Sequence, residues 1–135
     1  MIKIHIGLKG TGKTKNLIND VNGALALEKG NVVCITEGNR LMHDIDREAR
    51  LVNTEQFDIR NFDMFEGLLC GIIAQNFDIT HIFIDNLCKL LGNDASQAVD
   101  FCQWCEVFGE QNNLKFTIAI SDDPDSADER LRKYF

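Results

Sequence analysis

The stretch that decides the fold runs from residue 2 to residue 14 and reads IKIHIGLKGTGKT. Isoleucine at positions 2, 4 and 6 alternates with polar residues, and this period of two predicts a short strand. Glycine at positions 7, 10 and 12 lets the backbone adopt positive φ angles and approach a ligand closely. Apolar residues then recur at helical spacing as far as about Lys29, and Gly30 supplies a helix stop. The sequence therefore predicts a strand, a glycine-rich loop and a helix in direct succession.

The loop from Gly7 to Thr14 fits the pattern G-x-x-x-x-G-K-[ST] at every position. Successive backbone N–H groups in such a loop form an anion-binding nest, and the following helix directs its positive dipole end at the same point. Lys13 is expected to reach the β- and γ-phosphates of a nucleotide, and the Thr14 hydroxyl to bind Mg²⁺. The competing interpretation is a chance glycine-rich turn, but the motif stands between a strand and a helix. The predicted nucleotide-binding residues are Gly7, Leu8, Lys9, Gly10, Thr11, Gly12, Lys13, Thr14 and Lys15.

The rest of the chain continues the alternation of strands and helices. Strands are predicted at 32–35, 82–84 and 116–120, with a short edge strand at 51–52. Helices are predicted at 61–76, from Asp94 to about Gln111, and from about Ser126 onward, whereas the segment 41–50 has no clean period. This pattern predicts a single domain over residues 1–135, an α/β fold in three layers (α/β/α) with a mainly parallel sheet of about five strands.

Asp85 follows an apolar strand and stands where ligands bind in a parallel sheet, at a carboxyl end. It is the predicted second metal ligand beside Thr14, and the alternative is a cap that only ends the strand. The next residue, Asn86, can orient a water molecule but cannot accept its proton, so slow hydrolysis is expected. Glu37 is the candidate base, although a solvated loop residue is the commoner explanation. The candidate catalytic residues are Lys13, Asp85 and Glu37.

Other residues near the strand ends have more than one explanation. Ser121 either senses the γ-phosphate or begins a turn. Arg40, Arg130 and Arg132 are candidate arginine fingers, from this chain or a neighbouring subunit, but each is more commonly a surface side chain. The sequence lacks Asn-Lys-x-Asp, and Cys88 rather than glycine stands three positions after the strand-ending aspartate. ATP is therefore expected by elimination, in preference to GTP.

The loop at 7–14 and the apolar strand ending in Asp85 resemble the phosphate-binding and metal-binding motifs of the P-loop NTPase superfamily. The chain is also similar to small single-domain bacterial P-loop proteins labelled twitching-motility ATPase-like. The resemblance covers the whole domain in architecture and implies binding of ATP with Mg²⁺. It does not imply the motor function of pilus-retraction ATPases, because their N-terminal domain and their His- and Asp-rich motifs are not found in this sequence.

Three functions fit these motifs. The first is a slow or partner-stimulated ATPase, acting with a protein partner or as a homo-oligomer. The second is a kinase-like phosphotransferase for a small molecule or nucleotide, although only about sixteen residues, 41–56, are available for an acceptor site. The third is a regulator that binds ATP or ADP without turnover, which Asn86 favours over a motor. Acceptor-dependent formation of ADP would identify the second, and partner-stimulated hydrolysis would separate the first from the third.

The charge and the cysteine content limit which binding partners and which cellular compartment are expected for this protein. The chain has 14 Lys and Arg against 21 Asp and Glu, a net charge of −7, so the field that attracts nucleic acid or anionic lipid is not expected. No apolar run reaches the length of a membrane span, and neither nucleic acid nor membrane is an expected partner. Five scattered cysteines without a secretory signal predict reduced thiols in the cytoplasm. Cys102 and Cys105 share one apolar helix face, which favours core packing over a zinc or redox site.

Overall fold

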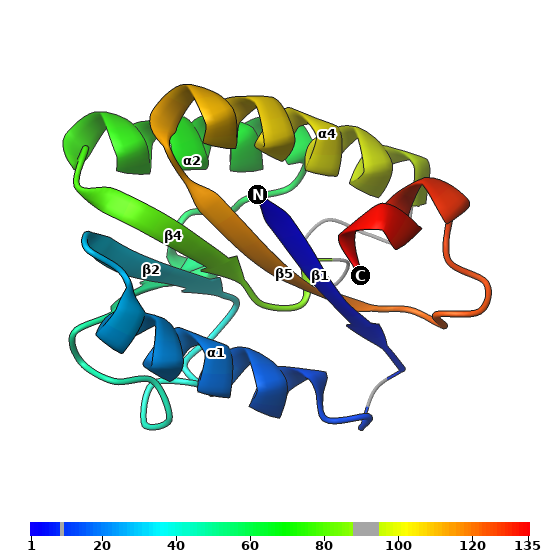
Figure 1. Cartoon of the computed structure of the whole chain (residues 1–135), viewed down its shortest axis with the longest axis horizontal. Helices are drawn as coiled ribbons and strands as arrows, with labels where there is room; N and C mark the ends of the chain where they lie inside the picture. The colour runs from blue at the N-terminus through cyan, green and yellow to red at the C-terminus, as the bar shows by residue number, and fades with distance from the viewer. Residues whose placement is uncertain (9, 88–94) are drawn as a thin grey trace.

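The computed structural model describes residues 1–8, 10–87 and 95–135, and within these ranges the chain forms a five-stranded sheet whose strand pairs are all parallel. The strand order is β1-β5-β4-β2-β3, so β5 lies between β1 and β4 (Figure 1). The strands are β1 (Ile2–Gly7), β2 (Asn31–Thr36), β3 (Arg50–Asn53), β4 (Ile79–Ile84) and β5 (Lys115–Ser121). The inner strands are buried along most of their length, which explains their nearly continuous apolar sequences.

Helices cover both faces of the sheet, as Figure 1 shows. One face carries α1 (Lys13–Leu27), and the other carries α2 (Phe62–Gln75) and α4 (Ala95–Asn112). The chain moves across the sheet from β1 to β2 and returns from β3 to β4 and β5, so right-handed crossovers put the later helices on the opposite face. The three-layer α/β/α prediction is confirmed. None of the helices in the described ranges has the length and hydropathy needed to cross a membrane.

The segment before β3 was left unassigned by its sequence and proves to be a series of turns. Its apolar residues Leu41, Ile45 and Ala49 are buried in the same cluster as the inner face of α1. The edge strand is longer than predicted, because Arg50 and Asn53 pair with β2 as well. The 3-10 helix η1 (Thr54–Gln56) follows directly.

The predicted C-terminal helix is present as the 3-10 helix η2 (Glu129–Tyr134), which begins about three residues later than expected. Leu131 and Tyr134 are its buried residues, and a spacing of three places both on one side of a helix with three residues per turn. The other helix predictions hold to within a few residues. Three sequence predictions concern residues outside the described ranges, namely Lys9, Cys88 and the helix start at Asp94.

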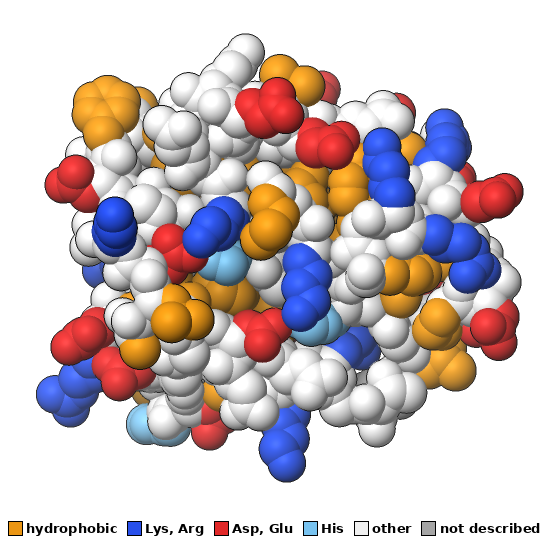
Figure 2. All heavy atoms as spheres, in the orientation of Figure 1, with side chains coloured by type: hydrophobic (Ala, Val, Ile, Leu, Met, Phe, Trp, Pro, Cys, Tyr) orange, Lys and Arg blue, Asp and Glu red, His pale blue; other side chains and the backbone are white. Residues whose placement is uncertain are grey.

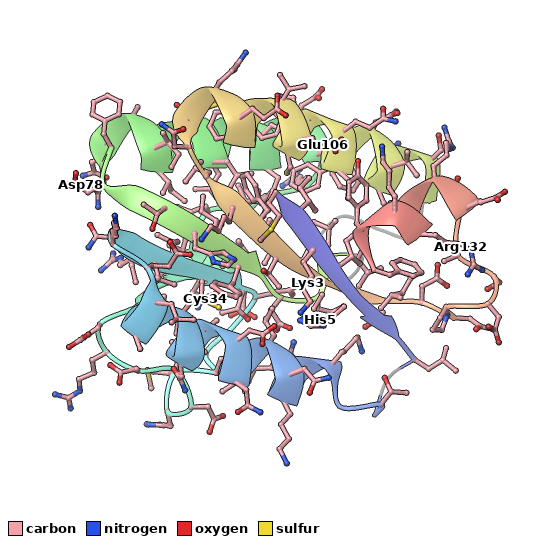
Figure 3. The ribbon with its side chains drawn as sticks, in the orientation of Figure 1. Lys3, His5, Cys34, Asp78, Glu106 and Arg132 are labelled. Carbon is pink, nitrogen blue, oxygen red and sulfur yellow. The ribbon has the colours of Figure 1, made fainter. Side chains whose placement is uncertain are left out.

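The hydrophobic core lies on both sides of the sheet. The cluster facing α2 and α4 contains Phe65, Leu69, Phe101 and Phe116, and the cluster facing α1 contains Leu17, Val21, Cys34 and Phe83. Figure 3 shows Cys34 between the sheet and α1. Cys102 and Cys105 are fully buried in the first cluster, which confirms their predicted core position. Burial of each large apolar side chain contributes about 1.5–3 kcal/mol, and the packed layers hold the strand ends in place.

Acidic and basic side chains are interspersed on the face of the molecule seen in Figure 2. Ion pairs join several of them, including Lys115 with Glu28 at 2.8 Å and Arg130 with Asp128 at 2.8 Å. The Arg130 pair is largely exposed and contributes little to stability, whereas the Glu28 side chain is buried.

Candidate functional site

The glycine-rich loop folds between β1 and α1, as predicted. Gly10 and Gly12 adopt φ angles of 88° and 86°, in the left-handed region that favours glycine. Gly7 ends β1 without a positive φ, so the reason predicted for glycine at this position is wrong. A Cβ at Gly7 would instead collide with Thr11 Oγ1, which donates a hydrogen bond of 2.7 Å to Leu8 O. Close packing of the loop on itself therefore requires glycine at the end of β1.

Helix α1 presents its amino terminus to this loop. Gly12 is the N-cap and has no side chain that could accept from the first N–H groups of the helix. The N–H groups of residues 13–15 have no intrahelical partner, and the dipole adds positive potential at the same end. The Lys13 side chain is 9% exposed, Thr14 is half-buried and Lys15 is exposed. These residues can offer N–H donors, an ammonium and a hydroxyl to a phosphate-like anion.

A cavity of about 480 Å³ adjoins the loop, a volume in the range of small-molecule sites. The lining residues are Ile4, His5, Ile6, Gly7, Leu8, Thr11, Lys13, Asn16, Pro124 and Phe135. Its apolar walls and few polar groups are typical of ligand pockets. His5 points from β1 toward α1 in Figure 3, where its Nε2 lies 2.6 Å from Asp20 Oδ2. This pair ties the strand to the helix behind the loop.

A larger cavity, of about 730 Å³, lies between the edge of the sheet and α2. Its walls are formed mainly by β2, β3 and α2, with Val33, Val52, Leu68 and Ile72 among the apolar residues. None of the candidate site residues lines it. This cavity has the larger volume, but the unpaired backbone donors of a helix start and the buried Lys13 lie at the glycine-rich loop. The loop is therefore the better candidate.

Asp85 follows β4 and is 1% exposed. Its backbone N–H donates to Ile35 O at 2.9 Å, and its Oδ2 accepts from Thr36 Oγ1 at 3.3 Å and from Arg40 Nη2. Its other oxygen, Oδ1, is buried and has no hydrogen-bond partner among the residues that the structure describes. A buried carboxylate oxygen without a partner is costly and calls for a functional explanation.

The segment after β2 brings Arg40 to Asp85, and β3 holds that segment in place. Gly38 N–H donates to Asn53 Oδ1 at 2.8 Å, and Asn53 Nδ2 donates to Asn39 Oδ1 at 3.2 Å. Gly38 needs its glycine, since its φ is 88°. Thr54 Oγ1 adds a hydrogen bond of 3.3 Å to Thr36 O. The loop that presents Arg40 is therefore fixed by side chains of the neighbouring strand.

The three candidate arginine fingers differ clearly in their surroundings. Arg40 pairs with Asp85 at the carboxyl edge of the sheet. Arg130 instead forms a bidentate contact with Asp128 at 2.8 and 3.1 Å. Arg132, which is part of η2 (Figure 3), donates to backbone carbonyls, at 3.2 Å to Pro124 O. Of the three, Arg40 is the one that touches a predicted site residue.

Ser121 and Asn86 join the ends of β5 and β4. Ser121 Oγ donates to Asn86 Oδ1 at 3.0 Å, and Asn86 has a φ of 54°, a conformation that asparagine tolerates better than most residues. Glu37 is half-buried directly after β2. Because β5 separates β1 from β4, ordinary strand spacing puts their carboxyl ends about 10 Å apart. The loop and Asp85 thus flank the end of β5.

The donor set around Asp85 fits Mg²⁺ better than a transition metal. In the described ranges, no three His, Cys, Asp or Glu side chains gather closely enough to hold a metal ion. Mg²⁺ typically uses one or two carboxylates and completes its shell with substrate phosphates and water. The partnerless Oδ1 of Asp85 is a candidate ligand of this kind. Cys34 is a neutral thiol beside the site, because burial, and to a lesser extent the charge of Asp85, raises its pKa to about 12.

Sequence analysis missed Thr36, Asn53 and the pairing of Arg40 with Asp85. Their roles depend on β2 lying between β4 and β3, which no local pattern encodes. The polar loop that follows the buried strand β2 was the one sequence signal for these residues, but it did not distinguish any single residue in the loop. The chain matches no protein-family model, and no curated protein shows significant similarity to it.

Proposed function

We propose that this protein binds ATP with Mg²⁺ and belongs to the P-loop NTPase superfamily. The observation that supports this most strongly is the glycine-rich loop, with two glycines at positive φ and Lys13 at the uncapped start of α1. A triphosphate is the ligand that suits an N–H nest, a helix N-terminus and an ammonium together. The partnerless oxygen of Asp85 gives the accompanying metal a ligand of its own.

Each residue has a separate part in this proposal. Lys13 neutralises charge on the β- and γ-phosphates, the N–H groups of the loop orient them, and Thr14 and Asp85 hold Mg²⁺. Glu37 is kept as the candidate base, although nothing in its surroundings favours that role. The nucleoside is expected in the cavity beside Lys13, against Leu8 and Phe135. ATP is preferred to GTP by elimination alone.

The reaction that follows binding is expected to be slow. Asn86 accepts from Ser121 and cannot act as a base. Arg40 is engaged by Asp85, and an arginine that reaches the γ-phosphate can be worth about 10³–10⁵ in rate. The protein is therefore proposed as a slow or partner-stimulated ATPase in the cytoplasm, or as a regulator that binds ATP or ADP without hydrolysing ATP. The protein partner, or a second copy of the chain, would supply what the site lacks.

Isothermal titration of Mg-ATP into the wild type and Lys13→Ala tests the binding site. Removing one charge-assisted contact should weaken binding by about 2–3 kcal/mol, whereas Lys29→Ala, an equal charge change at an exposed position, should not. Equal affinities for wild type and Lys13→Ala would refute the site. Phosphate release measured on the same wild-type samples should stay well below about 10 s⁻¹, a typical enzyme rate; a rate near that value would show that the catalytic set is already complete.

A further inference from the structure

Asp85 already has a cationic partner from its own chain. Arg40 donates through Nη2 to Asp85 Oδ2, and Thr36 donates to the same oxygen at 3.3 Å. Asp85 is 1% exposed, so its charge is removed from water and must be compensated by the protein or by a ligand. The guanidinium provides this compensation on one side of the carboxylate, while Oδ1 on the other side has no partner in the described residues.

The two members of this pair differ in how easily they can move. The Arg40 side chain is 46% exposed and extends from a loop. Its guanidinium can turn into water without leaving a cavity in the core. Asp85 is fixed at the end of a buried strand, and its backbone is bonded to Ile35 in β2. A change in the pairing would therefore move Arg40 and leave the carboxylate in place.

A metal ion bound to Asp85 would meet the positive charge of Arg40 on the same carboxylate. The two cations would lie only a few ångströms apart, and like charges at that distance in a partly buried site repel strongly. Thr36 is neutral and can remain bonded to Oδ2. The guanidinium and Mg²⁺ are therefore alternatives for compensating the same buried charge.

We propose that Arg40 and Mg²⁺ exchange at Asp85, so that Arg40 is a positioning residue that sets the Mg²⁺ requirement of the site. This inference rests on the proposed binding of Mg-nucleotide. With Arg40 in place, the carboxylate is held in the orientation that the metal needs, and its charge is balanced. When Mg-nucleotide arrives, the metal takes over the compensation and Arg40 leaves Oδ2. The guanidinium is then free to bind an anion such as a phosphate.

The exchange also connects the site to the loop after β2. Arg40 lies two residues from Gly38, whose N–H is bonded to Asn53. Release of Arg40 removes the contact of this loop with Asp85, while the hydrogen bonds from Asn53 still hold its beginning. The surface around the Arg40 side chain therefore differs between the metal-bound and metal-free protein, while buried Leu41 and Ile45 hold the segment beyond it. A partner could recognise that difference.

The test is a Mg²⁺ titration of ATP binding in wild type, Arg40→Ala and Arg40→Lys, with Arg47→Ala as the matched control. Arg47 is an exposed arginine in the same segment, so its loss makes the same change in net charge. We expect Arg40→Ala to lower the half-saturating Mg²⁺ concentration by on the order of tenfold. The reason is that the metal no longer competes with one charge-assisted hydrogen bond for Asp85. Arg40→Lys should fall between wild type and Arg40→Ala, and Arg47→Ala should match wild type.

Thermal unfolding with Mg²⁺ alone gives a readout that needs no nucleotide. Arg40→Ala should melt lower than wild type without the metal, and Mg²⁺ should raise its melting temperature more than that of wild type. The side-chain Nε–H signal of Arg40 in wild-type protein provides a further check that involves no mutation. This signal should shift when Mg²⁺ is added to protein saturated with ADP.

An unchanged or higher half-saturating Mg²⁺ concentration in Arg40→Ala would overturn the exchange. An Arg40 Nε–H signal that does not shift when Mg²⁺ is added would overturn it as well. If wild type binds nucleotide while either result is found, the exchange alone fails. If wild type binds no nucleotide with or without Mg²⁺, the proposed function fails, and the exchange fails with it.

Discussion

Two carboxylates are buried at opposite ends of the same sheet, and the protein surrounds them differently. At the amino ends of the strands, Glu28 is 8% exposed and its Oε1 accepts from Lys115 Nζ at 2.8 Å. The same oxygen lies 3.3 Å from His81 Nδ1, and His81 Nε2 lies 2.9 Å from Thr117 Oγ1. At the carboxyl ends, Asp85 has the half-exposed Arg40 on one oxygen and no described partner on the other.

The difference separates a network whose polar atoms have partners from a buried carboxylate with one oxygen that has no described partner. Burial alone would raise the pKa of Glu28, but Lys115, and to a lesser extent Thr80 and His81, outweigh burial and lower the pKa below 4.5. Burial lowers the pKa of His81 below 6.5, although Glu28 opposes that shift. The network keeps its members in defined protonation states with partners from three elements. Asp85 instead has one buried oxygen without a partner in the described residues, a feature that folding stability does not explain.

The substitution expected to change the free energy of unfolding most is at Glu28, and it tests the difference between the two carboxylates. Glu28→Ala leaves buried His81 and the Lys115 ammonium without their acceptor, so the free energy of unfolding should fall by about 2–3 kcal/mol. Urea denaturation measures this change, and Glu110→Ala, at an exposed position on α4, serves as control. A loss no greater than that of the control would mean that the amino-end cluster does not stabilise the fold.

A smaller effect is expected from pH. His81 binds a proton more weakly in the folded protein than in the unfolded chain, so stability should decrease as the pH falls below 6.5. The slope for one group stays within about 1.4 kcal/mol per pH unit. The free energy of unfolding should decrease further below pH 4.5, because Glu28 takes up a proton in the unfolded chain before it does so in the folded protein.

Urea unfolding at a series of pH values checks this dependence. His81→Gln removes the titrating ring and should flatten the upper part of the curve, between 6.5 and the lowered pKa of the folded protein. Stability that increases on acidification through this range, or an unchanged slope in His81→Gln, would contradict the buried neutral histidine.

The same contrast explains what could be predicted from the sequence. The glycine-rich loop and Asp85 were found because each depends on a local pattern, a spacing of glycines or an apolar run that ends in a carboxylate. The layer architecture also followed from the alternation of strands and helices. These features need no knowledge of which strands are neighbours.

The remaining features depend on long-range arrangement. Arg40 reaches Asp85 because β2 pairs with β4, and Asn53 holds the Arg40 loop because β3 pairs with β2. From sequence alone, Arg40 could not be distinguished from Arg130, which pairs with Asp128 two residues away. The sequence around His81 shows no metal-ligand spacing, and its partners Glu28 and Thr117 lie far from it in the chain.

The most direct test is an isothermal titration of ATP, with and without Mg²⁺, into wild type, Asp85→Asn and Glu28→Gln. Each substitution replaces one buried carboxylate by its amide at one end of the sheet. Wild type and Glu28→Gln should bind ATP at least about tenfold more tightly with Mg²⁺, and Asp85→Asn should lose this gain because its amide is a poor metal ligand. A wild-type Mg²⁺ response in Asp85→Asn, or no ATP binding by the wild type, would contradict the assignment of the carboxyl edge as the ligand site.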